Sequence, residues 1–410
     1  MIDDKKIENI SELRFLLITH TFATGPTQEL KDYFVKNNNN FSFIEHPFSY
    51  NKNQKQSKIT FFENGKEKKH VESIVIKGPD IFYFIKDFFY TIYFVIKTKK
   101  KYDVCIAADN LNAFSAWILK KFSYVDKLVY WTIDYTPKRF ENNLLNKIYH
   151  WIDRFCCYKA DLIWNSSKKM KDARIKNGMD IKKCVKEIIV CDGCHFNDIE
   201  RLSDDKVDRS KLVFMGHLVR GKGVNLIINV MPELIKKYPD ISLTIVGAGQ
   251  EEETLKNLIT ELNIKDKVVF TGFIKDHKDL EKTIASCGVA VAPYVPDPNS
   301  YTFFSDVGKV KVYLACGLPV LVTDVPEIAK DIQDQKAGLI FDYNKESLIK
   351  NIGILLDNDK EYFEYRHNAI DLAEGLDWNS IFRCAISKTL TLIMYDGKMS
   401  HITGVSLFKV

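Results

Sequence analysis

Short apolar runs alternate with helical stretches along most of the chain, which is the pattern of βαβ units and parallel sheets. In the first half we expect strands at 13–19, 41–45, 102–107, 128–132 and 162–164. The helices that follow are expected at 27–36, 80–98, 110–122, 143–158 and 166–176. A turn at 63–66 separates two further apolar runs, 59–62 and 71–76, and predicts an inserted β-hairpin.

The same alternation starts again after a polar stretch at 193–210, which has the composition of a linker. The second half predicts strands at 212–215, 242–246, 268–271, 289–292, 319–322 and 339–341. A chain of 410 residues is also too long for one ordinary core. The sequence therefore predicts an α/β protein with two doubly wound, Rossmann-like domains at 1–205 and 206–375, followed by a helix and tail at 376–410.

The composition is that of a globular protein and excludes a wholly disordered chain. The 59 Lys and Arg residues exceed the 54 Asp and Glu residues by too little to indicate nucleic acid as a partner. The opening residues do not resemble a secretory signal, and nine scattered cysteines do not suggest a disulfide framework. We therefore expect a cytoplasmic protein.

The segment at 80–97 is apolar enough to raise the question of a membrane span. Lys86 and Asp87 interrupt it, and a helical projection gathers charged residues and tyrosines on one side and the other apolar residues opposite, with Phe94 as the exception. This pattern predicts an amphipathic helix. Two interpretations stay open: the helix packs on a sheet, or it rests its apolar face on a membrane beside three lysines at 99–101.

In an open parallel sheet, ligands bind beyond the carboxyl ends of the strands, so the loops there are where chemistry is expected. The loop from Gly216 to Gly223 nearly matches a nucleotide-binding P-loop, but Gly223 replaces the Ser or Thr that would hold Mg²⁺. A glycine-rich turn with Lys222 before a helix still favours a phosphate-bearing ligand. The alternative is a turn with a solvated lysine.

The next loop carries Gly247 and Gly249 between a strand and a helix, as in a dinucleotide-binding fingerprint. Glu252 replaces the third glycine, and no acidic residue stands about 20 positions further on, where the fingerprint has its ribose-binding carboxylate. These differences disfavour NAD. They leave open a close approach of the backbone to part of a nucleotide.

A third loop follows the expected strand at 289–292 and leads to a helix that Ser305 or Asp306 is expected to cap. Gly308 would let a ligand approach the backbone there. Lys309 lies in the first turn, where the helix dipole disfavours a cation, so an anion between the lysine and the helix end would explain its position. The alternative is an ordinary surface lysine.

Together these loops resemble glycosyltransferase family 4 over residues 211–345, while the first half is similar in layout only. The similar segments, in order, are GHLVRGKGV, TIVGAGQEEETL, VVFTGFI, APY, SDVGKVKVYLACGLPVLVTDVPEIAKDI and KAGLIF. Each is weak alone, whereas six in this order are specific. The resemblance implies the GT-B fold, in which two Rossmann-like domains face a cleft and C-terminal helices cross back to the N-terminal domain. It also implies transfer of a sugar from a nucleotide-diphosphate donor with retention of anomeric configuration, in cell-surface glycan synthesis.

The resemblance also implies roles for individual residues. His217 and Lys222 fall where the family has a diphosphate-binding arginine and lysine, so only the lysine is kept. Phe304 and Val312 replace the family's paired glutamates, the second of which normally holds the ribose, whereas Lys309 fits a variant pattern in which it holds phosphate. Contacts with the donor are expected from Gly25, Gly216, His217, Lys222, Gly247, Gly249, Phe273, Ile274, Tyr294, Ser305, Asp306, Gly308, Lys309 and Glu327.

Four residues are candidates for catalysis. Asp109 and Asp134 follow strands of the first half, and either could accept the proton of an acceptor hydroxyl or orient that hydroxyl. Each could instead cap the next helix. Lys222 and Lys309 would stabilise the charge that develops on the leaving diphosphate. Because no Asp-x-Asp pair lies at a strand end, we expect transfer without a metal or any other cofactor.

The segment from Cys191 to His195 spells a haem-attachment pattern, but the expected lack of an export signal argues against haem. Zinc is also disfavoured, because Cys184, Cys191, Cys194 and His195 lie too close along the chain for a tetrahedral site.

We therefore expect a cytoplasmic glycosyltransferase that acts on a lipid-linked or polysaccharide acceptor, at the inner membrane face if the helix at 80–97 makes peripheral contact there. Two alternatives stay open. A nucleotide-sugar epimerase of the same fold would need acid and base carboxylates facing the sugar. A non-catalytic partner subunit of a transferase would explain the absent glutamate pair.

Overall fold

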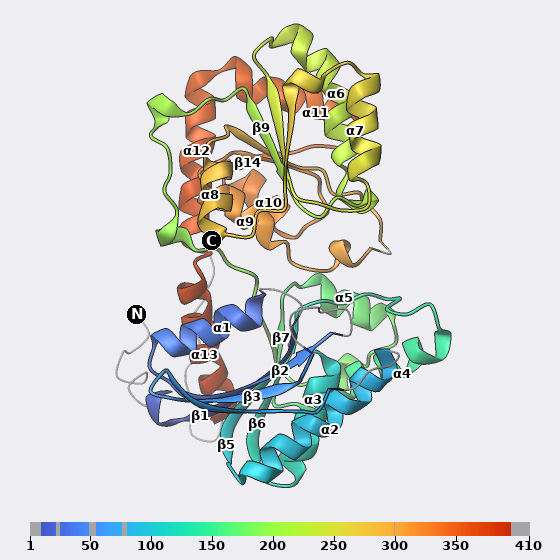
Figure 1. Cartoon of the computed structure of the whole chain (residues 1–410), viewed down its shortest axis with the longest axis vertical. Coiled ribbons are helices and arrows are strands. Elements are labelled where there is room, and N and C mark those ends of the chain that lie inside the picture. Colours follow the sequence, from blue (N-terminus) through green and yellow to red (C-terminus); the bar gives the residue numbers. More distant parts are fainter. Residues whose placement is uncertain (1–9, 22–24, 49–54, 76–79, 299, 395–410) are drawn as a thin grey trace. The chain divides into compact units, whose positions relative to one another are not determined.

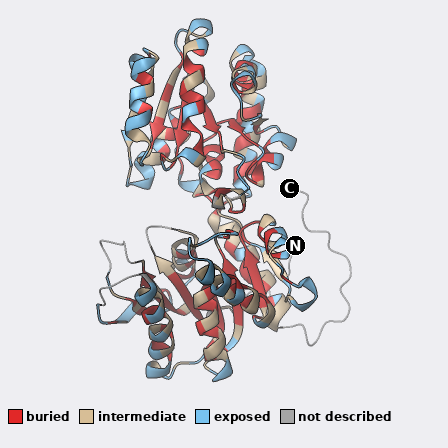
Figure 2. Cartoon of the chain, turned by 90° about the vertical axis from the view of Figure 1, so that its right-hand side faces the viewer, coloured by how far each residue is buried: buried red, intermediate tan, exposed pale blue. Residues whose placement is uncertain are grey.

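The computed structural model describes residues 10–21, 25–48, 55–75, 80–298 and 300–394. They form two compact units, one built from the chain up to Cys191 together with the chain from Ile381, the other from Asp192 to Ser380. Each unit is an α/β sheet with helices on its faces (Figure 1). Buried residues follow the strands and the inward sides of the helices, and exposed residues follow the outer sides of the helices (Figure 2).

The sheet of the first unit has eight strands in the order β4-β3-β2-β1-β5-β6-β7-β8. Their bounds are β1 Arg14–Thr21, β2 Asn40–Pro47, β3 Lys58–Glu63, β4 Lys66–Glu72, β5 Tyr102–Ala108, β6 Val125–Thr132, β7 Leu162–Asn165 and β8 Glu187–Ile189. Neighbouring strands are parallel except in the pairs β2–β3 and β3–β4, which are antiparallel. The predicted hairpin is therefore present, although its second strand begins directly after the turn, at residue 66, and not at 71.

Helices cover both faces of this sheet. They are α1 Pro26–Lys36, α2 Asp80–Thr98, α3 Asn110–Lys121, α4 Asn143–Lys159, α5 Lys169–Lys176 and α13 Trp378–Met394. Successive strand residues point to opposite faces, so Leu16 packs with residues of α2, α3 and α4. On the other face, Tyr33 of α1 contacts Phe382 of α13, and the indole of Trp164 donates a hydrogen bond to Thr389 Oγ1 at 2.8 Å. The last helix is thus part of the first unit's core from Ile381 onward.

The second unit has a fully parallel sheet in the order β11-β10-β9-β12-β13-β14. Its strands are β9 Lys211–Met215, β10 Ser242–Val246, β11 Val268–Gly272, β12 Val289–Ala292, β13 Val320–Val322 and β14 Gly338–Ile340. Its helices are α6 Val224–Lys237, α7 Glu252–Glu261, α8 His277–Ala285, α9 Gly308–Ala315, α10 Ile328–Asp334, α11 Lys345–Asp357 and α12 Asp359–Glu374. This strand order is that of a Rossmann fold, and it reverses between β9 and β12. The loops after these two strands therefore lie where such folds bind ligands.

Helix α2 buries two charged residues of its predicted polar side and exposes several residues of its predicted apolar side, which differs from simple packing of the apolar side on the sheet. Lys86, Asp87 and Thr91 are buried together with Phe94 and Val95. The exposed side of the helix instead carries a row of large hydrophobic residues, namely Ile81, Phe82, Ile85, Phe89, Tyr93 and Ile96. In the described part of the chain, no helix combines the length and apolar character needed to cross a membrane.

The polar residues under α2 neutralise one another. Asp87 Oδ1 accepts a hydrogen bond from Ser57 Oγ at 2.7 Å and lies 3.0 Å from Lys86 Nζ and 3.3 Å from His46 Nδ1. Its other oxygen lies 3.4 Å from His20 Nε2. Burial alone would raise the pKa of Asp87, but the contacts with the two histidines outweigh burial and hold this pKa well below its usual range. Burial lowers the pKa of His46 to about 4, so this imidazole is neutral at physiological pH.

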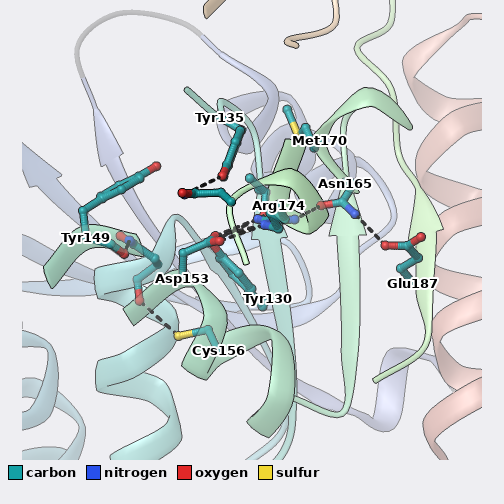
Figure 3. A network of polar contacts seen from close by, with 12 residues as sticks. Tyr130, Tyr135, Tyr149, Asp153, Cys156, Asn165, Met170, Arg174 and Glu187 are labelled. Atoms are coloured by element: carbon teal, nitrogen blue, oxygen red, sulfur yellow. Dashed lines mark hydrogen bonds and ion pairs between the residues drawn. The ribbon is translucent and has the colours of Figure 1, made fainter. Parts of the chain in front are cut away.

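A second buried network ties α4 and α5 to the sheet (Figure 3). Arg174 of α5 is 2% exposed, and its Nε and Nη2 donate to the Asp153 carboxylate of α4 at 2.9 and 2.8 Å. Its remaining donors reach Asn165 Oδ1 at 2.8 Å and Thr132 Oγ1 at 2.6 Å. The hydroxyl of Tyr130 completes the network with a 2.6 Å hydrogen bond to Asp153. Each buried charge is therefore paired and hydrogen-bonded, which is the condition under which burial is tolerated.

Candidate active site

The loops after β9 and β10 interlock at the carboxyl edge of the second unit's sheet. The Leu218 amide donates to the Ala248 carbonyl at 3.0 Å, and the Gly216 amide donates to the Val246 carbonyl at 2.9 Å. Gly247 has a φ of 138°, and a Cβ at this position would lie 1.9 Å from the Gly216 carbonyl oxygen. The glycine is therefore required by the packing of one loop on the other, whether or not a ligand also approaches it.

Lys222 lies in the loop after β9 and contacts residues of the loop after β12, and the strand order reverses between these two strands. It ends a 3-10 turn at Arg220–Lys222, and Gly223 with a φ of 70° then starts α6. The lysine is 7% exposed; its ammonium donates to Thr302 Oγ1 at 3.1 Å and lies 5.0 Å from the centre of the Tyr294 ring. Two of the predicted donor-binding residues, Lys222 and Tyr294, are thus in contact although they come from loops 70 residues apart.

The predicted cap of α9 is wrong. The helix begins at Gly308 with Val307 as its N-cap residue, so neither Ser305 nor Asp306 occupies the capping position. The Asp306 carboxylate instead pairs with buried Lys311 and accepts a hydrogen bond from the Asp192 amide at 2.6 Å. Asp306 therefore fastens the start of the second unit to the α9 segment, a structural task that the sequence pattern did not reveal.

The remaining predicted donor residues of this unit differ in how far they are exposed. Lys309 is exposed in the first turn of α9. His217 and Phe273 are also exposed, the Phe273 ring by 76%. Ser305 is buried, whereas Ile274 and Glu327 are half-buried.

Phe304 and Val312, which the resemblance places where the family has its paired glutamates, lie in apolar surroundings. Phe304 is 9% exposed, and Val312 packs against the core of the second unit. These side chains offer no hydrogen bond to a ribose. A nucleotide at this site would have to bind its ribose through other groups.

The first unit contains a cavity of about 500 Å³ at the carboxyl ends of β1, β5 and β6. Gly25, Asp109 and Asp134 all line it, so the structure brings the three candidate residues of the first half to one place. The other walls are apolar and come mainly from α2 and α4: Ile81, Phe84, Ile85, Phe88, Phe89, Leu145, Ile148, Tyr149 and Ile152.

Asp109 is held in an unusual backbone conformation at the polar end of this cavity. Its φ of 70° and ψ of 156° are rarely adopted by residues other than glycine and cost on the order of 1–3 kcal/mol. Its side chain makes no capping hydrogen bond to the first turn of α3, which is fully described, so the capping alternative does not account for it. Burial raises the pKa of Asp109, and nearby His20 and Arg139 oppose this shift.

Sequence reasoning missed His20 and Arg139, which line the same cavity. Both ring nitrogens of His20 are engaged, Nε2 with Asp87 at 3.4 Å and Nδ1 with Asn112 Nδ2 at 3.1 Å. The sequence could have identified His20, because it directly follows an apolar strand run. Asp109 and Asp134 were identified by the same kind of position.

The cysteines singled out as haem or zinc candidates pack in other ways. Cys194 is buried, and its thiol contacts the carbonyl oxygens of Ala373 and Leu376. Within the ranges that the structure describes, no group of three or more His, Cys, Asp or Glu residues is arranged to hold a metal ion.

Known proteins resemble the second unit in sequence and most of the chain in fold. Residues 197–373 match the family described as Glycosyl transferases group 1. The chain is 30% identical over 161 residues to an uncharacterized glycosyltransferase of Haemophilus influenzae, covering 39% of this chain and 43% of that protein. It is 28% identical over 254 residues to the Campylobacter jejuni enzyme N-acetylgalactosamine-N,N'-diacetylbacillosaminyl-diphospho-undecaprenol 4-alpha-N-acetylgalactosaminyltransferase, covering 61% and 64%. These matches span less than two thirds of each relative's length.

The structural likeness is broader. The crystal structure of Anabaena HepE in complex with UDP superimposes with a TM-score of 0.66 at 15% identity, covering 92% of this chain and 100% of that one. The chain therefore has the GT-B fold of two Rossmann-like units, as the resemblance in its sequence implied, and residues 197–373 are similar to the group 1 glycosyl transferases.

Proposed function

We propose that the protein is a retaining glycosyltransferase of family 4, which moves a sugar from a nucleotide-diphosphate donor to a lipid-linked or polysaccharide acceptor in the synthesis of a cell-surface glycan. The observation that carries the proposal is buried Lys222 at the reversal point of a group 1 domain. The Campylobacter relative is named for its action on a sugar linked to diphospho-undecaprenol, which supports a lipid-linked acceptor. The UDP bound to HepE supports a nucleotide donor.

The donor half of the reaction needs stabilisation of a leaving group. Breaking the bond between the anomeric carbon and the phosphate oxygen leaves negative charge on the nucleotide diphosphate. Lys222 and Lys309, together with amides at the helix ends, would stabilise this charge without a metal ion. The variant arrangement of Phe304 and Val312 means that family-like ribose recognition by a glutamate is not part of this mechanism.

The acceptor half uses the cavity of the first unit. As the new bond forms between the acceptor oxygen and the anomeric carbon, the acceptor hydroxyl loses its proton to Asp109, to Asp134 or to the leaving diphosphate. Asp109 is suited to this task because burial raises its pKa, which favours proton uptake, and because its carboxylate makes no capping hydrogen bond to α3.

A peripheral membrane contact on the cytoplasmic face belongs to the same proposal. The exposed row of apolar residues on α2, from Ile81 to Ile96, would rest on the lipid surface, and Lys99, Lys100 and Lys101 follow this helix directly. Sedimentation with vesicles that contain anionic lipid tests this contact. Protein that stays wholly in the supernatant at low salt would contradict it.

The test of the function is product analysis with purified protein. Each of the UDP-, GDP- and ADP-sugars is offered with a lipid-linked acceptor, and the product's anomeric configuration is read by NMR. The proposal predicts a new glycosidic bond with the configuration of the donor. An epimerised nucleotide sugar would show the epimerase alternative to be right. Nucleotide binding without turnover would instead favour the non-catalytic partner subunit, which the replaced glutamates also suggest.

A further inference from the structure

We infer that the cavity of the first unit binds an amphiphile whose uncharged, hydroxyl-rich head is attached directly to a hydrocarbon chain, as in a glycolipid. This inference rests on the proposed function and narrows its acceptor class. It distinguishes a sugar linked straight to a chain from a polysaccharide without lipid and from a sugar linked through phosphate, and in this last respect it departs from the diphospho-undecaprenol acceptor of the Campylobacter relative.

The hydrocarbon part is indicated by the walls that α2 and α4 provide. Two of the wall residues, Ile85 of α2 and Ile148 of α4, are 49% and 46% exposed. Large apolar side chains that line a cavity and remain open to water favour an apolar ligand, because its binding removes both surfaces from water. A hydrocarbon chain between the two helices would do this along the full length of both walls.

The charged side chains at the polar end of the cavity indicate that the head of the ligand is uncharged. Asp109, Asp134 and Arg139 line that end, so two carboxylates face one guanidinium. An additional anion such as a phosphate would be repelled by the two carboxylates and attracted by Arg139. His20 also lines the cavity, but its ring nitrogens are already engaged with Asp87 and Asn112. Sugar hydroxyls, in contrast, donate hydrogen bonds that the oxygens of the carboxyl groups accept. The site therefore suits a neutral polyol at its polar end.

The experiment is calorimetric binding of alkyl glucosides to the full chain, without any donor present. Hexyl, octyl and decyl glucoside are compared below their micelle concentrations, with octyl phosphate as the charged counterpart. We expect the Kd to fall roughly fourfold for each added CH₂ group, which corresponds to about 0.8 kcal/mol, until the chain outgrows the cavity. Octyl phosphate should bind at least about tenfold more weakly than octyl glucoside. A Kd that does not depend on chain length, or octyl phosphate binding as tightly as the glucoside, would overturn the inference.

Matched variants locate the binding. Ile148→Glu places a charge in the cavity wall at a position open enough to tolerate it, whereas Leu144→Glu changes a 65% exposed residue of the same helix that does not line the cavity. The first should weaken octyl glucoside at least about tenfold, and the second should leave its Kd unchanged. Ile85→Glu repeats the comparison on α2, should the first variant fail to fold, with Lys97→Glu at an exposed position of α2 away from the cavity as its control.

The result separates this inference from the proposed function. Alkyl glucoside binding is measured without nucleotide, so its failure leaves a transferase with another acceptor class in place. Failure of nucleotides to bind the second unit would refute the proposed transferase function. Glucoside binding to the first unit could still be measured in that case. Equal weakening by Ile148→Glu and Leu144→Glu would show that the glucoside binds elsewhere on α4.

Discussion

Replacing Lys222 with Met removes the ammonium that the proposed mechanism places beside the leaving diphosphate, while the unbranched side chain keeps its packing on Tyr294. Lys222 is 7% exposed, so an effective dielectric constant near 20 applies, and one charge pair at about 4 Å is worth about 4 kcal/mol compared with about 1 kcal/mol in water. Removing one such donor from a developing oxyanion lowers kcat by roughly 10²–10³, or about 2.7–4 kcal/mol. We expect a loss of turnover of this size.

The fold should change little in this variant. The hydrogen bond to Thr302 is lost, which costs about 1 kcal/mol, but the cost of burying an ammonium also disappears. Turnover is measured under donor saturation, and stability is measured by urea unfolding. Lys236→Met, at an exposed position near the end of α6, the helix that follows Lys222, serves as the matched control and should behave as wild type. Wild-type turnover in Lys222→Met would refute the assignment of this lysine to the leaving group.

Three further predictions follow from the buried networks and the proposed mechanism. Arg174→Met should reduce the free energy of unfolding by about 3–5 kcal/mol, because Asp153 is left buried without its partner, and adding Asp153→Leu should recover most of this loss in urea unfolding. Burial lowers the pKa of His46 from 6.5 to about 4, so the unfolded chain binds a proton that the folded chain excludes. Stability should therefore fall as the pH drops from 6.5 to about 4, by about 3 kcal/mol, and His46→Gln should lack this part of the pH dependence. Transfer should continue at an unchanged rate after dialysis against a chelator, whereas loss that Mn²⁺ or Mg²⁺ restores would contradict the metal-free mechanism.

Most parallel strands were predictable because strands buried on both faces are continuous apolar runs. The runs at 242–246 and 289–292 coincide with β10 and β12, and the helix expected at 80–98 coincides with α2. The strand at Glu187–Ile189 was missed because it is three residues long and lies partly exposed at the sheet edge, so it carries little apolar signal.

The orientation of α2 could not be predicted from its own period. A helical projection shows which side chains share a face but not which face meets the sheet. Asp87 lies inward because His20 and His46, which come from β1 and β2, supply its partners. This compensation depends on residues 41 to 67 positions away, which no local pattern contains.

The sequence predicted which loops form the site, but it predicted few of the contacts between their side chains. Asp109 and Asp134 were identified because they follow strands, and the cavity that unites them required the tertiary structure. Asp306 was misassigned as a helix cap because its actual partner is Lys311. The sequence pattern gave no sign that this lysine is buried and not on the surface of the helix. Tyr294 and Lys222 were both singled out, but only the fold brings their side chains together.

The most direct test of the account is the heat of binding of nucleotide diphosphates to the intact chain, compared between the wild type and Lys222→Met. The account predicts saturable binding of at least one of UDP, GDP and ADP, weakened in the variant and unchanged in Lys236→Met. The absence of binding heat with all three nucleotides and with their sugar derivatives would contradict the claim that the second unit is a donor site.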